Sequence, residues 1–388
     1  MPKPARAIQG NFASDTIDVL TGPDGEPRYL LADDPTREFS YRSPFILELE
    51  ITRRCNLRCV HCYAHAEDRD FGDELTLADF CRVLDQGRSA GIRDLSLTGG
   101  EVFMHPQFFD ILDAGLARGY DVRFVTNATL VDEPRLQALC ARPIKLITVS
   151  LDAISPAVHE RVRGPGSHRP ALDGIDRLIA AGFPLSIITA FSRLNIEDFD
   201  ALLGFCVERG LVWQVQMTSA KGRCPRSITF SPDEYYAFGE RVAEAIAARP
   251  PITIVSMDDL NTFSLLQPLG DLWRFWQGLC VGGLLNIFVR ATGEVTPCSA
   301  LAFPECVVGN VRRDSLATIC AEERCRKVLA WHRPEALTGA CASCPQRHEC
   351  SGGCPEILLC MCRARTENEY CYRHIEERRI LAEALGDA

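Results

Sequence analysis

The chain has 388 residues, 46% of them hydrophobic, which is enough to bury a large core, and its formal net charge is −10 at pH 7. This acidic balance, with no block of five or more basic residues, argues against duplex nucleic acid as the main partner. No apolar run reaches the ~18–20 residues of a membrane span, and the polar start MPKPARAIQG does not resemble a signal peptide. We therefore expect a cytoplasmic protein that does not engage a membrane.

The first segment, residues 1–44, carries little periodicity. Within it, TIDVLTGPDGEPRYLL (16–31) predicts two short strands around a Gly-Pro-Asp-Gly turn. We expect this segment to form a small hairpin or cover, with a disordered leader as the alternative. Such a hairpin could add a strand to an extended peptide.

Residues 45–251 alternate apolar strand-like runs with amphipathic helical stretches. The expected strands are residues 45–52, 93–99, 121–127, 144–152, 184–191 and 211–217. The expected helices are residues 77–91, 105–119, 133–140, 170–182, 196–210 and 231–250. Units of this kind require parallel strands, and six of them fall short of the eight that close a full barrel. We therefore predict an α/β fold, a partial (βα)6 TIM-like barrel with its chemistry at the carboxyl ends of the strands.

Cysteine is the anomaly in the composition. Nineteen are present, and twelve of them lie between Cys280 and Cys371. In a long cytosolic chain, closely spaced cysteines are more often metal ligands or catalytic thiols than disulfides. We expect residues 252–388 to form a cysteine-rich α+β domain of short elements, ending in the charged helix HIEERRILAEAL.

Three cysteines, Cys55, Cys59 and Cys62, follow the first expected strand in the stretch CNLRCVHCY. A structural zinc site would need a fourth ligand, for which His61 or His65 is available. A 4Fe–4S cluster needs only three protein thiolates if one iron stays open for a substrate or cofactor. Open coordination is what catalysis requires, and the spacing favours the cluster.

CNLRCVHCY resembles the signature of the radical S-adenosylmethionine (SAM) superfamily, whose members carry this spacing after the first strand of a partial (βα)6 barrel. The resemblance implies that the three cysteines ligate a 4Fe–4S cluster with one iron open to SAM. Turns after later strands match as well, and they imply SAM-binding roles for Thr98, Gly99, Gly100, Glu101, Asn127, Ser150 and Arg163. The glycine-rich turn and its glutamate would hold the methionine amino group, and Ser150 and Arg163 would contact ribose or carboxylate. Taken singly, Asn127 and Ser150 are more often local hydrogen-bonding residues.

The C-terminal cysteines follow the pattern C-x12-G-x4-C…C-x2-C-x5-C-x3-C…C. A zinc ribbon would use four of them, but seven exceed one tetrahedral site. The full pattern is similar to the SPASM domain, an extension of radical SAM enzymes that holds two auxiliary 4Fe–4S clusters. By this resemblance the first auxiliary cluster is ligated by Cys280, Cys298 and Cys354. The second is ligated by Cys341, Cys344, Cys350 and Cys371.

The remaining cysteines leave one question open. Asn286 stands where some relatives have a further cysteine, so the first auxiliary cluster either keeps an open iron or recruits Cys306, Cys360 or Cys362. We interpret Cys81, Cys140 and Cys206 as small core residues of amphipathic helices. Cys224, Cys320 and Cys325 receive no assignment.

The resemblance also implies the chemistry. Reductive cleavage of SAM would give a 5′-deoxyadenosyl radical, which abstracts a hydrogen from a substrate at the barrel mouth. SPASM enzymes mostly modify peptides or proteins, so we expect a crosslinked or oxidised residue, as in ribosomal peptide maturation.

Sulfatase-type Cys or Ser oxidation and tetrapyrrole or other small-molecule modification are alternatives. A non-enzymatic zinc or iron–sulfur binding module is the alternative of a different class. Besides the substrate, we expect a low-potential electron donor such as flavodoxin or ferredoxin as a partner. The sequence does not identify a catalytic base.

Overall fold

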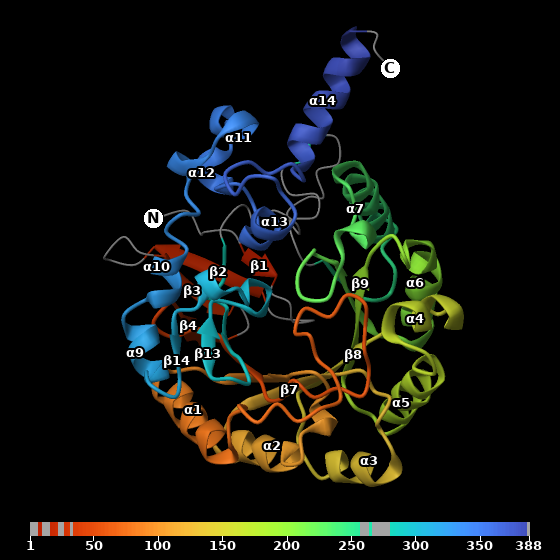
Figure 1. The fold of residues 1–388 in the computed structure, drawn as a ribbon, viewed down its shortest axis with the longest axis vertical. Coiled ribbons are helices and arrows are strands. Elements are labelled where there is room, and N and C mark those ends of the chain that lie inside the picture. Colours follow the sequence, from red (N-terminus) through yellow and green to blue (C-terminus); the bar gives the residue numbers. More distant parts are fainter. Residues whose placement is uncertain are drawn as a thin grey trace.

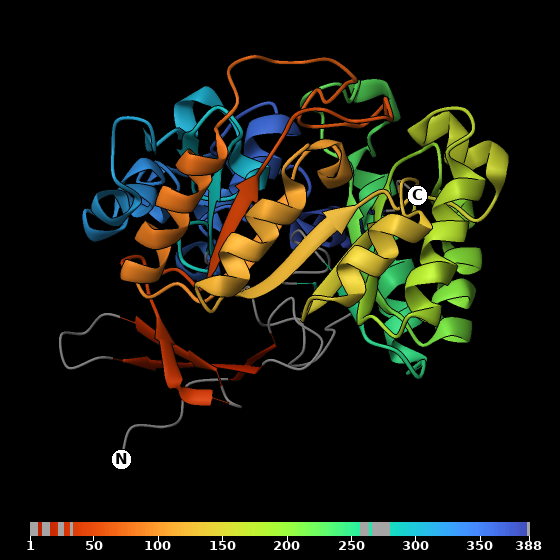
Figure 2. The same cartoon turned by 90° about the horizontal axis from the view of Figure 1, so that it is seen from below.

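The computed structural model describes residues 7–9, 16–21, 27–31, 34–256, 264–265 and 280–385. These residues form two sheets, one of four strands and one of ten. The larger sheet is curved, with helices along its outer side (Figure 1). The smaller sheet lies beyond the amino ends of the barrel strands, at the end opposite to the cysteine-bearing loop (Figure 2).

The small sheet is antiparallel throughout and runs in the order β1-β2-β3-β4. Its strands are β1 (Ala7–Gln9), β2 (Thr16–Thr21), β3 (Pro27–Leu31) and β4 (Asp34–Phe39). The two strands predicted within residues 16–31 are confirmed as β2 and β3, with Ile17 opposite Leu31. The predicted Gly-Pro-Asp-Gly turn lies outside the described residues.

Six parallel strands form the barrel, and all six were predicted to within two residues at either end. They are β5 (Ile46–Glu50), β6 (Asp94–Thr98), β7 (Asp121–Thr126), β8 (Leu146–Ser150), β9 (Leu185–Phe191) and β10 (Val212–Met217). Side chains alternate along β5: Leu47 and Leu49 belong to the core under the helices, whereas Glu48 and Glu50 face the barrel interior. The predicted partial barrel is confirmed.

The helices after the strands pack outside the sheet (Figure 1). They are α1 (Leu77–Ser89), α2 (Phe108–Ala117), α3 (Glu133–Cys140), α4 (Pro156–Arg163), α5 (His168–Ala180), α6 (Phe199–Arg209) and α7 (Pro232–Ala247). Helix α4 was not predicted. Helix α7 begins with a capping box, in which Ser231 and Glu234 cap each other's backbone N–H groups. The interpretation of Cys140 as a core residue was wrong. Cys140 is exposed at the end of α3, because that helix turns the neighbouring Leu139 inward. Cys206 is buried, as expected.

The C-terminal part extends the barrel sheet at both edges. Strand β11 (Ile254–Ser256) pairs with β10, and β12 (Asn286–Val289) pairs in parallel with β5. Strands β13 (Glu294–Thr296) and β14 (Gly309–Asn310) continue outward from β12. No sequence pattern predicts this pairing. Strands from both sides of residue 251 share this sheet. The domain boundary expected after residue 251 stays a prediction.

Short elements complete the C-terminal part, as expected, and they occupy the side of the barrel that its own helices leave uncovered (Figure 1). The helices are α9 (Leu316–Ala321), α10 (Arg324–Val328), α11 (Gly339–Ser343), α12 (Arg347–Cys350), α13 (Pro355–Cys360) and α14 (Tyr372–Leu385). A single 3-10 turn, η5 (Ser299–Leu301), follows Cys298. The predicted terminal helix is confirmed as α14. Among the described helices, none combines the length and apolar character of a membrane span.

Candidate active site

The first three cysteines lie on the irregular loop between β5 and α1, at the carboxyl end of the barrel strands (Figure 2). Burial raises the pKa of Cys55 to about 12 and that of Cys59 to about 11, and the neighbouring thiols of the set add to both shifts. The three thiols therefore lie within electrostatic range of one another. Thiols with such raised pKa values become thiolates only beside a strong positive charge, and iron supplies one.

A short segment behind this loop, residues 220–226, holds it in place. It follows β10, and we call it the strap. The backbone N–H of Arg223 donates to the carbonyl oxygen of Cys62 at 2.9 Å, and its guanidinium donates to the carbonyl oxygens of Cys59 at 3.0 Å and Ala66 at 2.6 Å. Gly222, at φ +57°, packs so closely that a Cβ atom would lie 2.5 Å from the Cys62 oxygen. The sequence interpretation missed the strap, although its position just after the sixth strand was a usable signal.

The glycine-rich turn after β6 lies against the start of the same loop. The backbone N–H of Gly100 donates to the carbonyl oxygen of Thr52 at 2.7 Å, and that of Glu101 donates to Arg54 at 2.8 Å. A Cβ atom on Gly99 would lie 2.5 Å from the Thr52 oxygen, and one on Gly100 would clash with the Arg54 carbonyl. These glycines are required because two backbone segments meet here, whatever ligand the turn also binds.

Glu101 and Asn127 connect neighbouring strand ends. The buried Glu101 carboxylate accepts hydrogen bonds from the Thr126 hydroxyl and from the Asn127 backbone N–H, both at 2.7 Å. Burial raises the pKa of Glu101. The Asn127 side chain donates to Asn56 Oδ1 at 3.0 Å and lies 3.9 Å from Cys55 Sγ, so it contacts the cysteine loop directly. Thr98, the last residue of β6, is buried beside them.

Arg163 lies at the end of α4, beneath the loop. Its Nε forms an ion pair with Asp152 Oδ2 at 2.7 Å, and Cys59 Sγ lies 3.8 Å from the Arg163 carbonyl oxygen. Burial would raise the pKa of Asp152, but the charges of Arg163 and His61 hold it below its usual range. The predicted contact between Arg163 and SAM thus has a competitor, because Asp152 already neutralises this guanidinium. Ser150 ends β8 nearby and is half-buried.

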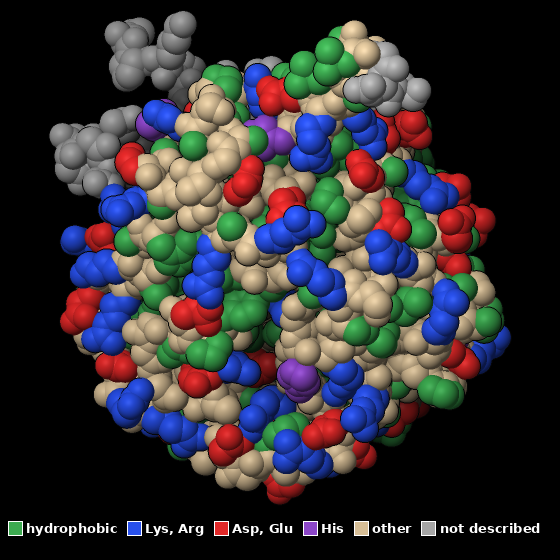
Figure 3. Space-filling view, turned by 45° about the horizontal axis from the view of Figure 1, so that its top comes forward, with side chains coloured by type: hydrophobic (Ala, Val, Ile, Leu, Met, Phe, Trp, Pro, Cys, Tyr) green, Lys and Arg blue, Asp and Glu red, His purple; other side chains and the backbone are tan. Residues whose placement is uncertain are grey.

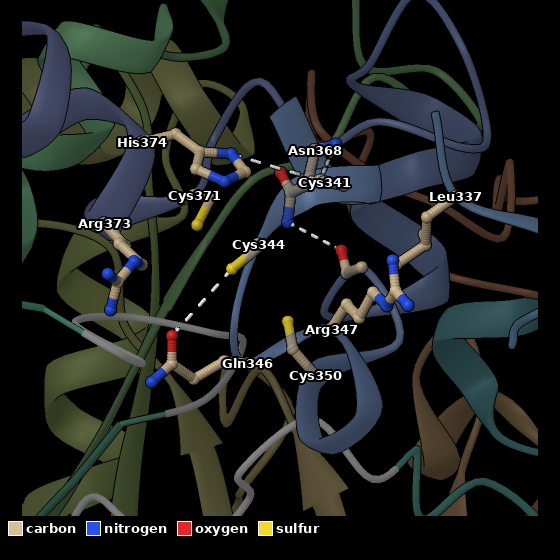
Figure 4. A pocket seen from close by; sticks show the side chains of 11 residues that line it. Leu337, Cys341, Cys344, Gln346, Arg347, Cys350, Asn368, Cys371, Arg373 and His374 are labelled. Atoms are coloured by element: carbon tan, nitrogen blue, oxygen red, sulfur yellow. Dashed lines mark hydrogen bonds between the residues drawn. The ribbon is translucent and has the colours of Figure 1, made fainter. Parts of the chain in front are cut away.

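Four cysteines of the C-terminal part line one pocket, which is partly open to solvent. Cys341 and Cys344 come from the end of α11, Cys350 ends α12, and Cys371 precedes α14 (Figure 4). Burial raises the pKa of Cys371 to about 12, with Cys341 and Cys344 adding to the shift. These are the four residues that the sequence assigned to the second auxiliary cluster.

The three cysteines assigned to the first auxiliary cluster, Cys280, Cys298 and Cys354, do not line a common pocket of this kind among those described. Cys298 is half-buried, and the charge of Cys280 adds to the rise in its pKa, so the two are neighbours. Cys354 begins α13, which packs against η5, the turn that follows Cys298. Both Cys280 and Cys298 pack on an apolar cluster that contains Cys306. Of the three optional fourth ligands, Cys306 shares this apolar cluster with the pair.

The donor set consists of cysteines, whose thiolates are the usual protein ligands of iron–sulfur clusters. Within the described residues, no three His, Cys, Asp or Glu side chains are close enough together to hold one ion. A tetrahedral zinc site would bring its ligands to a single centre, whereas a 4Fe–4S cluster spreads its thiolates over separate irons. All nineteen cysteines are described, and none forms a disulfide bond.

Two family models match the chain. One, described as the Radical SAM superfamily, covers residues 49–206, and the other, described as an iron–sulfur cluster-binding domain (SPASM), covers residues 280–345. The chain belongs to the radical SAM superfamily. It is accordingly a radical SAM enzyme with a SPASM domain, and it uses SAM together with SAM-binding and auxiliary 4Fe–4S clusters. The first match contains every residue predicted at the SAM site, whereas Cys350, Cys354 and Cys371 lie beyond the second.

Known proteins are similar along most of this radical SAM chain. An AdoMet-dependent heme synthase of Methanosarcina barkeri is 29% identical over 335 residues, which cover 83% of this chain and 92% of the relative. Mycofactocin maturase MftC of Mycobacterium ulcerans is 26% identical, with 82% and 84% covered. The crystal structure of Streptococcus suis SuiB bound to precursor peptide SuiA has a TM-score of 0.68 at 19% identity, with 84% and 75% covered. The last similarity supports the fold alone.

Proposed function

We propose that this enzyme modifies a peptide or protein substrate, in which it forms a crosslink or an oxidised residue. The observation that carries the proposal is that the cysteine triad and the turns after β6, β7 and β8 meet at one end of a barrel whose uncovered side is occupied by the short elements of the SPASM region (Figure 1). SAM bound to its cluster supplies a 5′-deoxyadenosyl radical that removes a hydrogen atom from the substrate.

The chain's own residues would hold the clusters and bind SAM. Cys55, Cys59 and Cys62 hold the SAM-binding cluster, and Arg223 fixes the carbonyl groups of their loop. The turn at residues 98–101 presents backbone groups to the methionine amine, while Ser150 offers a hydroxyl to the ribose or carboxylate. Arg163 would bind the same region only in competition with Asp152, 2.7 Å away. The seven SPASM cysteines hold the two auxiliary clusters.

The named relatives support a peptide substrate. One is a mycofactocin maturase, and the similar fold of SuiB was solved with its precursor peptide. Addition of a peptide strand to the small N-terminal sheet stays a prediction, and this sheet lies at the far end of the barrel from the cysteine loop (Figure 2). The reacting residue would therefore reach the barrel mouth by a separate route.

A second candidate function is tetrapyrrole modification, because the heme synthase match has the higher identity, 29%. The charges around Lys221 argue against it. Glu48 and Glu356 both act on Lys221, which is ion-paired with Glu356. Carboxylates in excess suit an uncharged or cationic substrate group better than the several carboxylates of a tetrapyrrole.

We also propose the cellular setting. The absence of disulfides among nineteen cysteines fits a reducing cytoplasm. A low-potential donor such as flavodoxin or ferredoxin would reduce the SAM-binding cluster. On the face shown in Figure 3, basic and acidic side chains are interspersed, with no block of basic residues that would favour duplex nucleic acid.

The experiment is a comparison of substrates under anaerobic conditions. Reconstituted enzyme, SAM and reductant are incubated either with peptides encoded by short neighbouring reading frames or with a carboxylated tetrapyrrole. Mass spectrometry then follows the substrate. Loss of two hydrogen atoms from a peptide residue supports the proposal. A decarboxylated tetrapyrrole with unmodified peptides would replace it by the second candidate.

A further inference from the structure

The strap also contains Lys221, one of four lysines in the chain. Its Nζ lies 5.3 Å from the ring centroid of Tyr63, the residue after Cys62. On its other side, the same Nζ forms an ion pair with Glu356 Oε1 at 2.6 Å and donates to the carbonyl oxygen of Ala300 at 3.2 Å. One ammonium group thus contacts both the loop of the SAM-binding cysteines and the SPASM domain.

The SPASM partners of Lys221 lie beside ligands proposed for the first auxiliary cluster. Ala300 follows Cys298 by two residues, and Glu356 follows Cys354 by two. The side chains of Lys221 and Glu356 are only 17% and 7% exposed, so water screens their charges weakly. The ion pair therefore lies between the two cysteine sites.

The electrostatics of this region agree with that placement. Burial opposes the charge of Lys221, but Glu356, with smaller contributions from Cys360 and Cys298, raises the pKa of the ammonium, so it stays charged. Lys221 and Glu356 carry opposite charges, and their contacts lie within two residues of Cys298 and Cys354. The two members of the pair thus act with opposite sign on negative charge at this cysteine site.

We propose that the Lys221–Glu356 pair sets the reduction potential of the first auxiliary cluster. This inference rests on the proposed function, and it adds that the first auxiliary cluster accepts an electron from the substrate. After hydrogen abstraction the substrate holds an unpaired electron. Transfer of that electron to the oxidised cluster and release of a proton to solvent leave the substrate oxidised by two electrons. Lys221 stabilises the negative charge that the cluster gains, and Glu356 opposes it.

The test is a redox titration followed by electron paramagnetic resonance. The parent protein carries alanine at Cys55, Cys59 and Cys62, so that only auxiliary clusters give a signal. Lys221→Met should lower the midpoint potential of one cluster, because it leaves Glu356 unpaired, and Glu356→Gln should raise it. Lys221→Arg should leave it unchanged. If Lys221→Met loses iron, Lys221→Gln carries the same test.

The matched control is Lys145→Met. Lys145 pairs with Asp94 and Asp121 at the amino end of the barrel strands, so its loss should leave both potentials unchanged. Shifts of opposite sign cannot come from a structural role, since simple loosening would move both variants alike. Equal potentials, or shifts of the same sign, at unchanged iron content would overturn the inference alone. A parent protein without auxiliary iron would instead overturn the proposed function and, with it, this inference.

Discussion

Arg223 donates a hydrogen bond of 3.0 Å to the backbone carbonyl of Cys59, 164 positions earlier in the chain. The contact joins the end of the barrel to its beginning, because Arg223 follows the last barrel strand and Cys59 follows the first. A second bond from the same guanidinium reaches Ala66 at 2.6 Å. The cysteine loop is therefore held in shape by the strap, although it contains no regular structure of its own.

Replacing Arg223 should weaken SAM cleavage. In Arg223→Gln the charged hydrogen bonds to two carbonyl groups are lost, each worth about 1.5–3 kcal/mol, so we expect a roughly tenfold or greater fall in 5′-deoxyadenosine formation. Arg169→Gln is the control, since Arg169 is 84% exposed and pairs only within its own helix. Equal rates in the two variants would show that the strap does not support the loop.

The turn after β6 should not tolerate a side chain at residue 100. Gly100→Ala places a Cβ atom against the Arg54 carbonyl, and overpacking of this kind destabilises a protein by about 1–3 kcal/mol. Gly204→Ala, in helix α6 with open space around it, should stabilise by up to ~1 kcal/mol. Anaerobic thermal denaturation measures both, and a neutral Gly100→Ala would contradict the close backbone packing.

Loss of Cys371 should affect only the SPASM side. Cys371→Ala removes one of four thiols around the pocket, and we expect roughly a third of the iron to be lost while the SAM-binding cluster remains. The exposed Cys140 supplies the control, Cys140→Ala, which should keep all its iron. An unchanged iron content in Cys371→Ala would remove this residue from the ligand set.

Stability should fall in mild acid because of His159. Burial, reinforced by Arg163, lowers the pKa of this fully buried imidazole from 6.5 to about 4. As the pH falls from 6.5 to 4, the unfolded chain binds a proton that the folded chain does not, so stability is lost by up to roughly 3 kcal/mol. Urea unfolding across this range should show the loss, and a His159→Leu variant should lack that part of it. Parallel pH profiles for the two proteins would exclude His159 as the cause.

The barrel was predictable from the sequence because its signals are local. Each strand is an apolar run followed by an amphipathic helix, and alternation along residues 46–50 already separates the core face from the interior face. The pairing of β12 with β5 was not predictable, since it joins segments some 240 residues apart without a pattern of its own. Helix α4 was missed because its eight residues include a proline and two arginines and hold few apolar side chains.

The residues of the site were likewise predictable only in part. Spacing identified the cysteines, and it grouped the four that line one pocket. Spacing could not show that Asp152 neutralises Arg163, nor that Glu101 is held by Thr126 and the backbone of Asn127, because such contacts form only when strand ends meet. The contacts of Lys221 could not be predicted from the sequence for the same reason.

The most direct test of the account is SAM cleavage by reconstituted protein and by Cys59→Ala. Three clusters would give roughly twelve iron per chain, and with reductant the wild-type protein should convert SAM to 5′-deoxyadenosine. Cys59→Ala should lose this activity, while Cys81→Ala, changed in the outer helix α1, should retain it. Cleavage of SAM by Cys59→Ala at the wild-type rate, or a wild-type protein that binds two zinc ions and leaves SAM intact, would contradict the account.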